Sequence, residues 1–261
     1  MKFLKFAYTF DENIDDWIEH KDLPFSDFLH QRKLGDTLKS IILHAIALSD
    51  CHVTTYTGLL RTQRYLKSVG KYGNTPFIIS SYGMSEIVQA FARLSAVFNG
   101  VFMLNKKVKA VAINNEDNTC KKIILDQGEI IRCRYVIASS IYFSQWAELH
   151  HKIARAFYIT ARSINFQEDY FFINDEYKNK QNAFLVVPQN TKILVTDDSS
   201  YEISSNVFIT QLSERSSSCP QNYFIIYMRS QSLNLDAALK DLKMLENYYF
   251  CTSITLNLVF V

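Results

Sequence analysis

Apolar residues recur at helical spacing through residues 1–72. Three helices are predicted, in PFSDFLHQ (24–31), TLKSIILHAIALSD (37–50) and TGLLRTQRYLKSVG (57–70), because apolar side chains three and four residues apart share one helix face. Gly70 stands where glycine often ends a helix. The run IILHAIAL is apolar around more than half its circumference, so we expect a helix buried on all sides, and a lipid-lined groove is the alternative.

The segment SYGMSEIVQAFARLSAVFNGVFMLN (81–105) predicts a turn, a helix and the start of a strand. Ser85 and Glu86 suit a helix N-terminus, where a capping hydroxyl and a negative charge are favoured. Apolar residues then follow at spacings of four, three and four, which places them in one stripe expected to face a core. The stripe consists of Ile87, Phe91, Leu94 and Phe98.

Alternation with a period near two replaces the helical spacing further along the chain. Residues 101–140 predict a meander with turns at 114–118 and 126–128, ending on the run RYVIAS. Residues 151–232 predict more strands, in ARAFYIT, NAFLVVP, KILVT, NVFITQL and YFIIYMRS, and residues 235–249 predict an amphipathic helix. The expected fold class is therefore α+β.

Composition indicates a folded protein that does not bind nucleic acid. Hydrophobic residues are 48% of the 261 and charged residues 21%, the net charge is +2, and no basic run exceeds a pair. Five scattered cysteines without a C-x-x-C motif indicate reduced thiols rather than disulfides or a metal site. Neither end carries an apolar stretch long enough for a signal peptide or a bilayer span, so we expect a cytosolic protein.

Motifs of ordinary catalysis do not occur in the sequence. It has no H-E-x-x-H, no G-x-S-x-G and no P-loop, and no metal or cofactor is expected. The order of helix, meander and β-rich run is typical of the latter part of a flavin-type domain. Such a domain begins with a strand and a Gly-rich turn that binds phosphate, and no G-x-G-x-x-G occurs. A flavin amine-oxidase-like enzyme fragment is therefore only a distant alternative.

Three segments resemble the family of Rab GDP-dissociation inhibitors and Rab escort proteins. They are KYGNTPFI (71–78), YGMSE (82–86) and QAFARLSAVFNGVFMLNK (89–106). The segments DFLHQRKL, LHAIALS and ARAFYITARSI are similar to the escort branch, whereas ARLSAVFNG and Met103 are similar to the inhibitor branch. The resemblance extends from residue 1 to about 250 and favours an escort protein.

The resemblance implies a fold, a domain division and an incomplete chain. A partial FAD/NAD(P)-binding-like (GDI-like) multisheet domain is expected at 73–250 and a small helical domain at 1–72, with 251–261 unassigned. The family's first nucleotide-fold segment, and the C-terminal segment that returns to the same sheet, have no counterpart here. The chain thus looks truncated at both ends, and unpaired sheet edges should make it poorly stable in isolation.

The resemblance also implies a function without catalysis. Escort proteins bind Rab GTPases in the GDP form, present them to the α and β subunits of Rab geranylgeranyltransferase, and deliver prenylated Rab to membranes during vesicle-mediated transport. The helical domain would accommodate the geranylgeranyl lipid and meet the transferase, and membrane contact would be transient. The alternative is a Rab GDP-dissociation inhibitor, which recycles prenylated Rab and does not support prenylation.

Six residues match positions at which the family binds Rab. The GTPase surface would be met by Tyr82, Glu86, Arg93 and Met103, and the extended Rab C-terminal tail by Lys71 and Phe77. Lys71 stands where arginine is usual, which would weaken a bidentate contact.

Helical spacing is compatible with the roles of Glu86 and Arg93. Seven residues make two helical turns, so the two charges share one face about 10 Å apart, too far for a direct bond. Fixed charges on a rigid helix can provide electrostatic complementarity to a protein. The alternative is an ordinary solvated helix surface, as most surface charges are.

Overall fold

The computed structural model describes residues 2–11, 15–114, 119–142, 152–161, 163–164, 182–196, 199–232, 234–250 and 258–260. The chain divides into two compact units, Met1–Glu86 with His151–Val261, and Ile87–His150. Helix α5 (Ser85–Val97) begins at the end of the first unit and continues into the second. The domain boundaries predicted near residues 72 and 250 stay predictions.

The N-terminal part of the chain is helical, as its apolar spacing predicts. Its elements are α1 (Lys2–Tyr8), the 3-10 helix η1 (Asp15–His20), α2 (Phe25–Gln31), α3 (Asp36–Ser40), the π-helix η2 (Ile41–Ile46) and α4 (Thr55–Ser68). Their apolar faces form one core rich in aromatic rings, in which the Phe10 and Trp17 centroids are 4.8 Å apart. Helix α4 can approach α2 closely because Gly58 has no side chain, and a Cβ there would overlap the Phe25 ring. Gly70, with φ of 78°, follows α4 as predicted.

The second predicted helix changes form along its length, from α3 to the wider turn of η2. Within the run IILHAIAL, Ile41 is 46% exposed and Ala45 is exposed as well, so the expectation of a helix buried on all sides is wrong. A π-helix holds more residues per turn, which moves apolar positions off the line that faces the core. His44 in this turn lies with its Nδ1 3.0 Å from the Ser49 carbonyl oxygen, and burial lowers the pKa of its imidazole.

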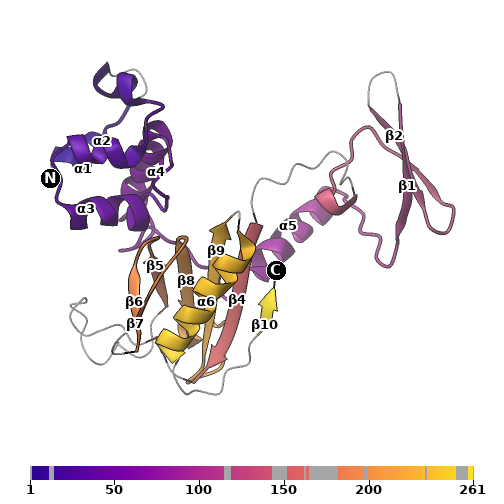
Figure 1. The fold of residues 1–261 in the computed structure, drawn as a ribbon. Coiled ribbons are helices and arrows are strands. Elements are labelled where there is room, and N and C mark those ends of the chain that lie inside the picture. Colours follow the sequence, from indigo (N-terminus) through magenta and orange to yellow (C-terminus); the bar gives the residue numbers. More distant parts are fainter. Residues whose placement is uncertain are drawn as a thin grey trace. The chain divides into compact units, whose positions relative to one another are not determined.

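An antiparallel five-stranded sheet forms the other part of the first unit, in the order β10-β4-β9-β8-β5. Its strands are β4 (Lys152–Thr160), β5 (Ala183–Val187), β8 (Val207–Leu212), β9 (Phe224–Ser232) and β10 (Leu258–Phe260). Alternate side chains point to one face, and α6 (Leu235–Phe250) lies across that face (Figure 1). Tyr158 of β4, Met228 of β9 and Leu245 of α6 are buried there. The predicted strands at these positions and the predicted last helix are confirmed.

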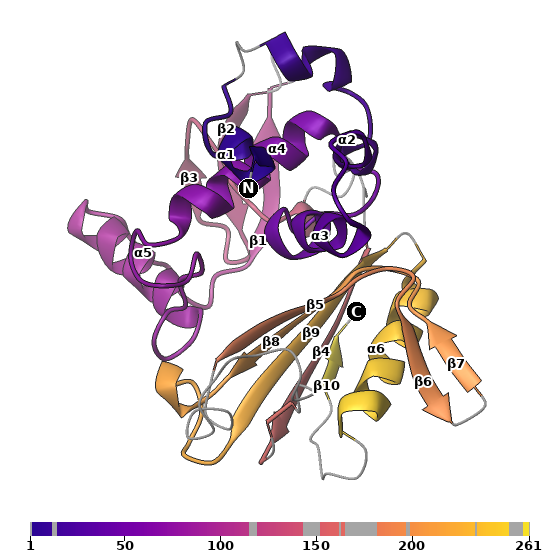
Figure 2. The same cartoon turned by 90° about the vertical axis from the view of Figure 1, so that its left-hand side faces the viewer.

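A two-stranded ribbon, β6 (Lys192–Thr196) and β7 (Ser199–Glu202), lies beside α6 (Figure 2). Sequence alternation predicts β6 but not β7, which is short and polar. The ribbon is tied to the helix through Asp241, whose buried carboxylate accepts hydrogen bonds from Tyr201 and from the following loop.

The second unit carries the three-stranded meander β1 (Val108–Ile113), β2 (Cys120–Leu125) and β3 (Ile130–Arg132), paired in that order. The turn predicted at 126–128 is confirmed, and the one at 114–118 lies largely outside the described residues. The strand expected from residue 101 begins only at Val108, because Asn105 adopts a left-handed φ of 58° that interrupts an extended chain. RYVIAS forms no strand: no described strand pairs with it, and backbone groups without a partner strand stay open to water.

The apolar stripe of α5 is not packed in a core, contrary to the prediction. Phe91 is 67% exposed and Phe98 77%, and Ile87 and Leu94 are exposed as well. Helical periodicity shows only that a face is apolar, and covering it requires another element that no described residue supplies. Among the described residues, no helix is both long and apolar enough to cross a bilayer.

Candidate functional site

A constrained turn precedes α5 and carries Tyr82. Tyr82 has φ of 63° and Gly83 has φ of 94°, so two successive residues adopt the left-handed conformation. That conformation costs a non-glycine residue about 1–2 kcal/mol. Two hydrogen bonds hold the turn in place: the Tyr82 N–H donates to the Ser216 carbonyl at 2.8 Å, and the Ser80 hydroxyl donates to the Gly83 carbonyl at 2.7 Å. The turn thus presents the exposed Tyr82 side chain at a fixed place immediately before the helix.

Glu86 and Arg93 both lie in α5, as predicted, and both are exposed. An α-helix rises 1.5 Å per residue, so their seven-residue separation places them about 10 Å apart along one side of the helix. The ion pairs found among the described residues are Asp36–Lys39 and Lys106–Glu129, so neither charge is neutralised by a neighbour in the described part of the chain. Both charges are therefore available to another molecule.

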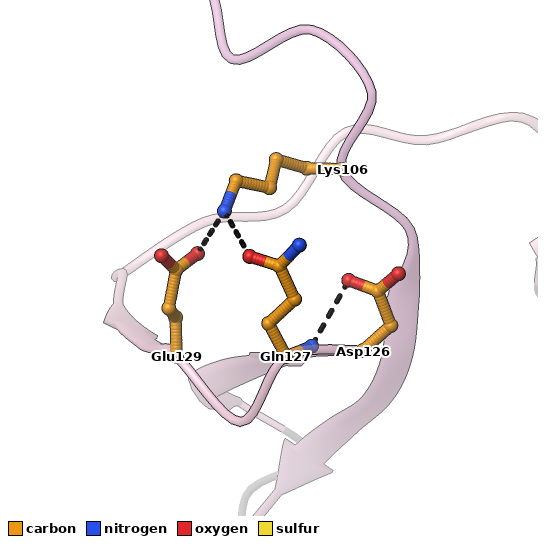
Figure 3. A network of polar contacts seen from close by, with 4 residues as sticks. All are labelled: Lys106, Asp126, Gln127 and Glu129. Atoms are coloured by element: carbon orange, nitrogen blue, oxygen red, sulfur yellow. Dashed lines mark hydrogen bonds and ion pairs between the residues drawn. The ribbon is translucent and has the colours of Figure 1, made fainter.

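Met103 lies in the segment between α5 and β1, and its side chain is exposed. Lys106, three residues later, anchors this segment to the β2–β3 turn (Figure 3). Its Nζ lies 2.8 Å from Glu129 Oε2 and 2.8 Å from Gln127 Oε1. The Asp126 carboxylate accepts the Gln127 N–H at 3.0 Å, which shapes the turn that holds both acceptors.

Lys71 and Phe77 lie on the segment between α4 and the Tyr82 turn, but in different surroundings. Lys71 is exposed and contacts the neighbouring Tyr72 ring, with Nζ 5.4 Å from its centroid. Phe77 packs edge-on against Tyr65 of α4, with ring centroids 6.0 Å apart, and in a tilted arrangement against Phe184 of β5, with centroids 5.1 Å apart. Phe77 thereby connects the helical part of the first unit to its sheet.

The structure thus divides the six predicted residues into groups. Glu86 and Arg93 share one helix, and Tyr82 lies on the turn that begins it. Phe77 belongs to an aromatic cluster with Tyr65, Phe184 and Phe208 that sequence reasoning missed. Its members come from distant parts of the chain, and no sequence spacing indicates that they meet.

Comparison with known proteins identifies the family. The profile described as GDP dissociation inhibitor matches residues 1–246. The chain belongs to the GDP dissociation inhibitor family. It is similar to Rab proteins geranylgeranyltransferase component A 2 of Mus musculus, with 39% identity over 168 residues, which are 63% of this chain and 27% of that protein.

Other family members extend the similarity over more of the chain. Component A of Drosophila melanogaster is 28% identical over 242 residues, 91% of this chain and 44% of that protein. Guanosine nucleotide diphosphate dissociation inhibitor 1 of Arabidopsis thaliana is 29% identical over 171 residues, 62% of this chain and 38% of that protein. The chain therefore spans less than half the length of these curated relatives.

A solved structure confirms the predicted fold class. The crystal structure of Rab GDI from Plasmodium falciparum superposes with a TM-score of 0.71 at 20% identity, covering 99% of this chain and 55% of that one. The fold is therefore the α+β fold of the GDP dissociation inhibitors.

Proposed function

We propose that this chain binds Rab GTPases in the GDP form, and that Tyr82, Glu86, Arg93 and Met103 contact the GTPase. The observation that carries the proposal is a pair of exposed charges on one side of α5 that no described residue neutralises, following a turn held in a strained conformation. Strained backbone tends to persist where the surrounding structure holds it for a binding role. A rigid pair of charges increases association rate and selectivity for a surface of complementary charge.

Within this proposal, Lys71 and Phe77 bind the extended C-terminal tail of the Rab. An aromatic ring that is 37% exposed, on a segment with a nearby cation, offers apolar contact and hydrogen-bond donors to a peptide. Lysine donates from a single ammonium group and cannot form the forked contact of arginine. Lys71→Arg is therefore expected to strengthen tail binding, and Lys71→Ala to weaken it.

The finer role that we propose is that of an escort protein acting in the cytosol. It would be the non-catalytic component A that presents Rab to Rab geranylgeranyltransferase and then delivers prenylated Rab to membranes. The support is the similarity to relatives that carry the component A name. The helical part, with Leu38 and Ile41 exposed along α3 and η2, would contact the transferase and the geranylgeranyl chain.

A pull-down with GDP-loaded Rab tests the binding surface. Glu86→Ala and Arg93→Ala should each reduce the retained Rab about tenfold, since a charged hydrogen bond at an interface contributes about 1.5–3 kcal/mol. Lys243→Ala, a charge removal on an exposed site of α6, is the matched control and should retain Rab as the wild type does. Equal retention by all variants would refute the assignment of Glu86 and Arg93.

The second candidate is a Rab GDP-dissociation inhibitor, favoured by the similarity to the Arabidopsis inhibitor over 62% of the chain. A prenylation assay with purified transferase separates the two roles. An escort protein increases transfer of the geranylgeranyl group to Rab, whereas an inhibitor extracts prenylated Rab from vesicles and leaves transfer unchanged.

A further inference from the structure

A cavity of about 480 Å³ opens in the first unit beside α4. Its wall combines α4, the turn that follows η2, the segment around Phe77, and the sheet face opposite α6. The size lies within the range of about 300–1,000 Å³ that is typical of small-molecule sites. Basic side chains line it (Arg61, Arg64 and Arg229), together with the rings of Tyr65, Phe77 and Phe208.

The three arginines are an unusual lining because none of the described residues that line the cavity is acidic. Arg61 and Arg64 are three residues apart on α4 and therefore share one helix face. Arg61 donates to the Ser49 hydroxyl at 2.8 Å, and Arg229 lies over the Phe208 ring at 4.9 Å. Neither contact neutralises a positive charge, and no ion pair in the described part of the chain involves any of the three.

The sheet adds a fourth positive charge next to Arg229. Arg155 of β4 is directly opposite Arg229 in the antiparallel pair, so both side chains project from the same face of the sheet. Like charges placed directly opposite destabilise a sheet. Arg155 and Arg229 lie on the same sheet face as the cavity. An anion bound in the cavity would reduce the repulsion between these two positive charges.

The turn at the rim of the cavity is strained. Leu48 has φ of 48°, a left-handed conformation that is unfavourable for leucine and that glycine would adopt freely. The Ser49 N–H donates to the Leu43 carbonyl at 3.0 Å, and the Asn206 side-chain amide donates to the Ser49 carbonyl at 3.0 Å. These bonds fix the turn to the sheet and so hold Arg61, through Ser49, in its place at the cavity.

We propose that this cavity binds a phosphate-bearing ligand with a ring or short chain, such as an inositol phosphate. Guanidinium groups match phosphate oxygens with two parallel hydrogen bonds, and three of them suit a ligand with two or more negative charges. The aromatic wall provides apolar contact for the carbon part of the ligand. The inference goes beyond Rab binding and does not depend on it.

Isothermal titration with inositol trisphosphate tests the proposal on the full chain. Binding should saturate at one site, and Arg229→Ala and the double variant Arg61→Ala/Arg64→Ala should each weaken it tenfold or more. Arg229→Lys keeps the charge but loses the forked contact, so its affinity should fall between those of Arg229→Ala and the wild type. Lys243→Ala, on α6 at the opposite face of the sheet, should bind as the wild type does.

Two further arms identify the source of the phosphate. Co-sedimentation with phosphatidylcholine vesicles, with and without phosphatidylinositol bisphosphate, detects a lipid headgroup. Binding to the phosphorylated vesicles, competed by free inositol trisphosphate, indicates a membrane lipid. Binding of free inositol trisphosphate without binding to vesicles indicates a free phosphate compound.

The proposal is overturned if inositol trisphosphate does not bind, if both arginine variants bind it as the wild type does, or if an acidic peptide binds equally well. Circular dichroism and thermal unfolding of each variant separate lost binding from lost folding. Glu86→Ala should bind inositol trisphosphate normally, so the Rab-binding proposal and this one can fail independently.

Discussion

Replacing Asp241 tests how the first unit holds its ribbon and helix together. The carboxylate is fully buried and accepts hydrogen bonds from the Tyr201 hydroxyl at 2.9 Å and the Ser204 hydroxyl at 2.6 Å. It also accepts the Ser204 and Ser205 backbone N–H groups, each at 3.1 Å, and the Ser205 hydroxyl at 3.1 Å. One side chain of α6 therefore accepts hydrogen bonds from Tyr201 of β7 and from Ser204 and Ser205 of the β7–β8 loop.

The magnitude follows from the donors that lose their acceptor. A buried donor without an acceptor costs about 1–3 kcal/mol. Asp241→Ala removes the acceptor of two backbone N–H groups and three hydroxyl groups. The hydroxyls can rotate and Ser204 is exposed to water, so the loss should be about 3 kcal/mol rather than the sum of all five contacts. Asp241→Asn should lose about half as much stability. Its remaining side-chain oxygen still accepts hydrogen bonds, whereas its new NH2 group is a donor placed against donors.

Thermal unfolding followed by circular dichroism measures the effect. At about 2–4 °C per kcal/mol for a unit of this size, Asp241→Ala should lower Tm by about 6–12 °C. Asp236→Asn, an exposed carboxylate in the first turn of the same helix, is the control and should cost at most about 1 kcal/mol. Tm values of Asp241→Ala and Asp241→Asn within 2 °C of the wild type would refute the reasoning.

The same contact gives a pH signature at Tyr201. Burial, and then the neighbouring Asp241 carboxylate, raises the pKa of the Tyr201 hydroxyl to about 12. A folded pKa above the unfolded value of about 10 gives stability that is complete below pH 10 and lost as the pH rises toward 12. Tyr201→Phe should therefore show a smaller loss of stability across that interval than the wild type.

Three shorter predictions concern other parts of the chain. Gly58→Ala should lower the free energy of unfolding, measured with a chemical denaturant, by about 1–3 kcal/mol, because the new methyl group would overlap the Phe25 ring. Gly35→Ala, where a methyl group would meet open space, should leave that free energy nearly unchanged. Burial lowers the pKa of His44, so the stability that neutral His44 provides is present above pH 6.5 and lost as the pH falls. His44→Asn should therefore make Tm depend less on pH between pH 7.5 and 5.5. An unchanged dependence of Tm on pH would contradict this. An exposed-hydrophobe dye should bind the wild type and fluoresce less with Phe91→Gln, and no dye signal from the wild type would count against an uncovered stripe.

Helical and alternating patterns predicted those elements whose cores form within the described residues. The helix around Leu59 and the strands around Ile209 and Ile226 bury one face against a neighbour, so the spacing of their apolar residues reflects their packing. RYVIAS and the stripe of α5 have similar patterns without a covering element, and there the predictions of a strand and a core were wrong. Periodicity shows which positions of an element are apolar. Whether a strand pairs or an apolar face is buried depends on the other elements that pack against it.

The candidate site was predictable where it lies on one helix and not where distant segments meet. Glu86 and Arg93 share a helix face because seven residues make two turns, so their relation follows from sequence spacing alone. The left-handed φ of Tyr82 and the cavity that joins Arg61 to Arg229 depend on tertiary contacts. No local spacing encodes those contacts, so only the folded chain reveals them.

Titration of a GDP-loaded Rab carrying a fluorescent nucleotide tests the central claim most directly. Binding should be saturable and stronger for the GDP form than for a GTP-analogue form. The double variant Glu86→Ala/Arg93→Ala should weaken it by more than tenfold, while thermal unfolding stays that of the wild type. Equal affinity of the wild type and the double variant for GDP-loaded Rab, or no binding by the wild type, would contradict it.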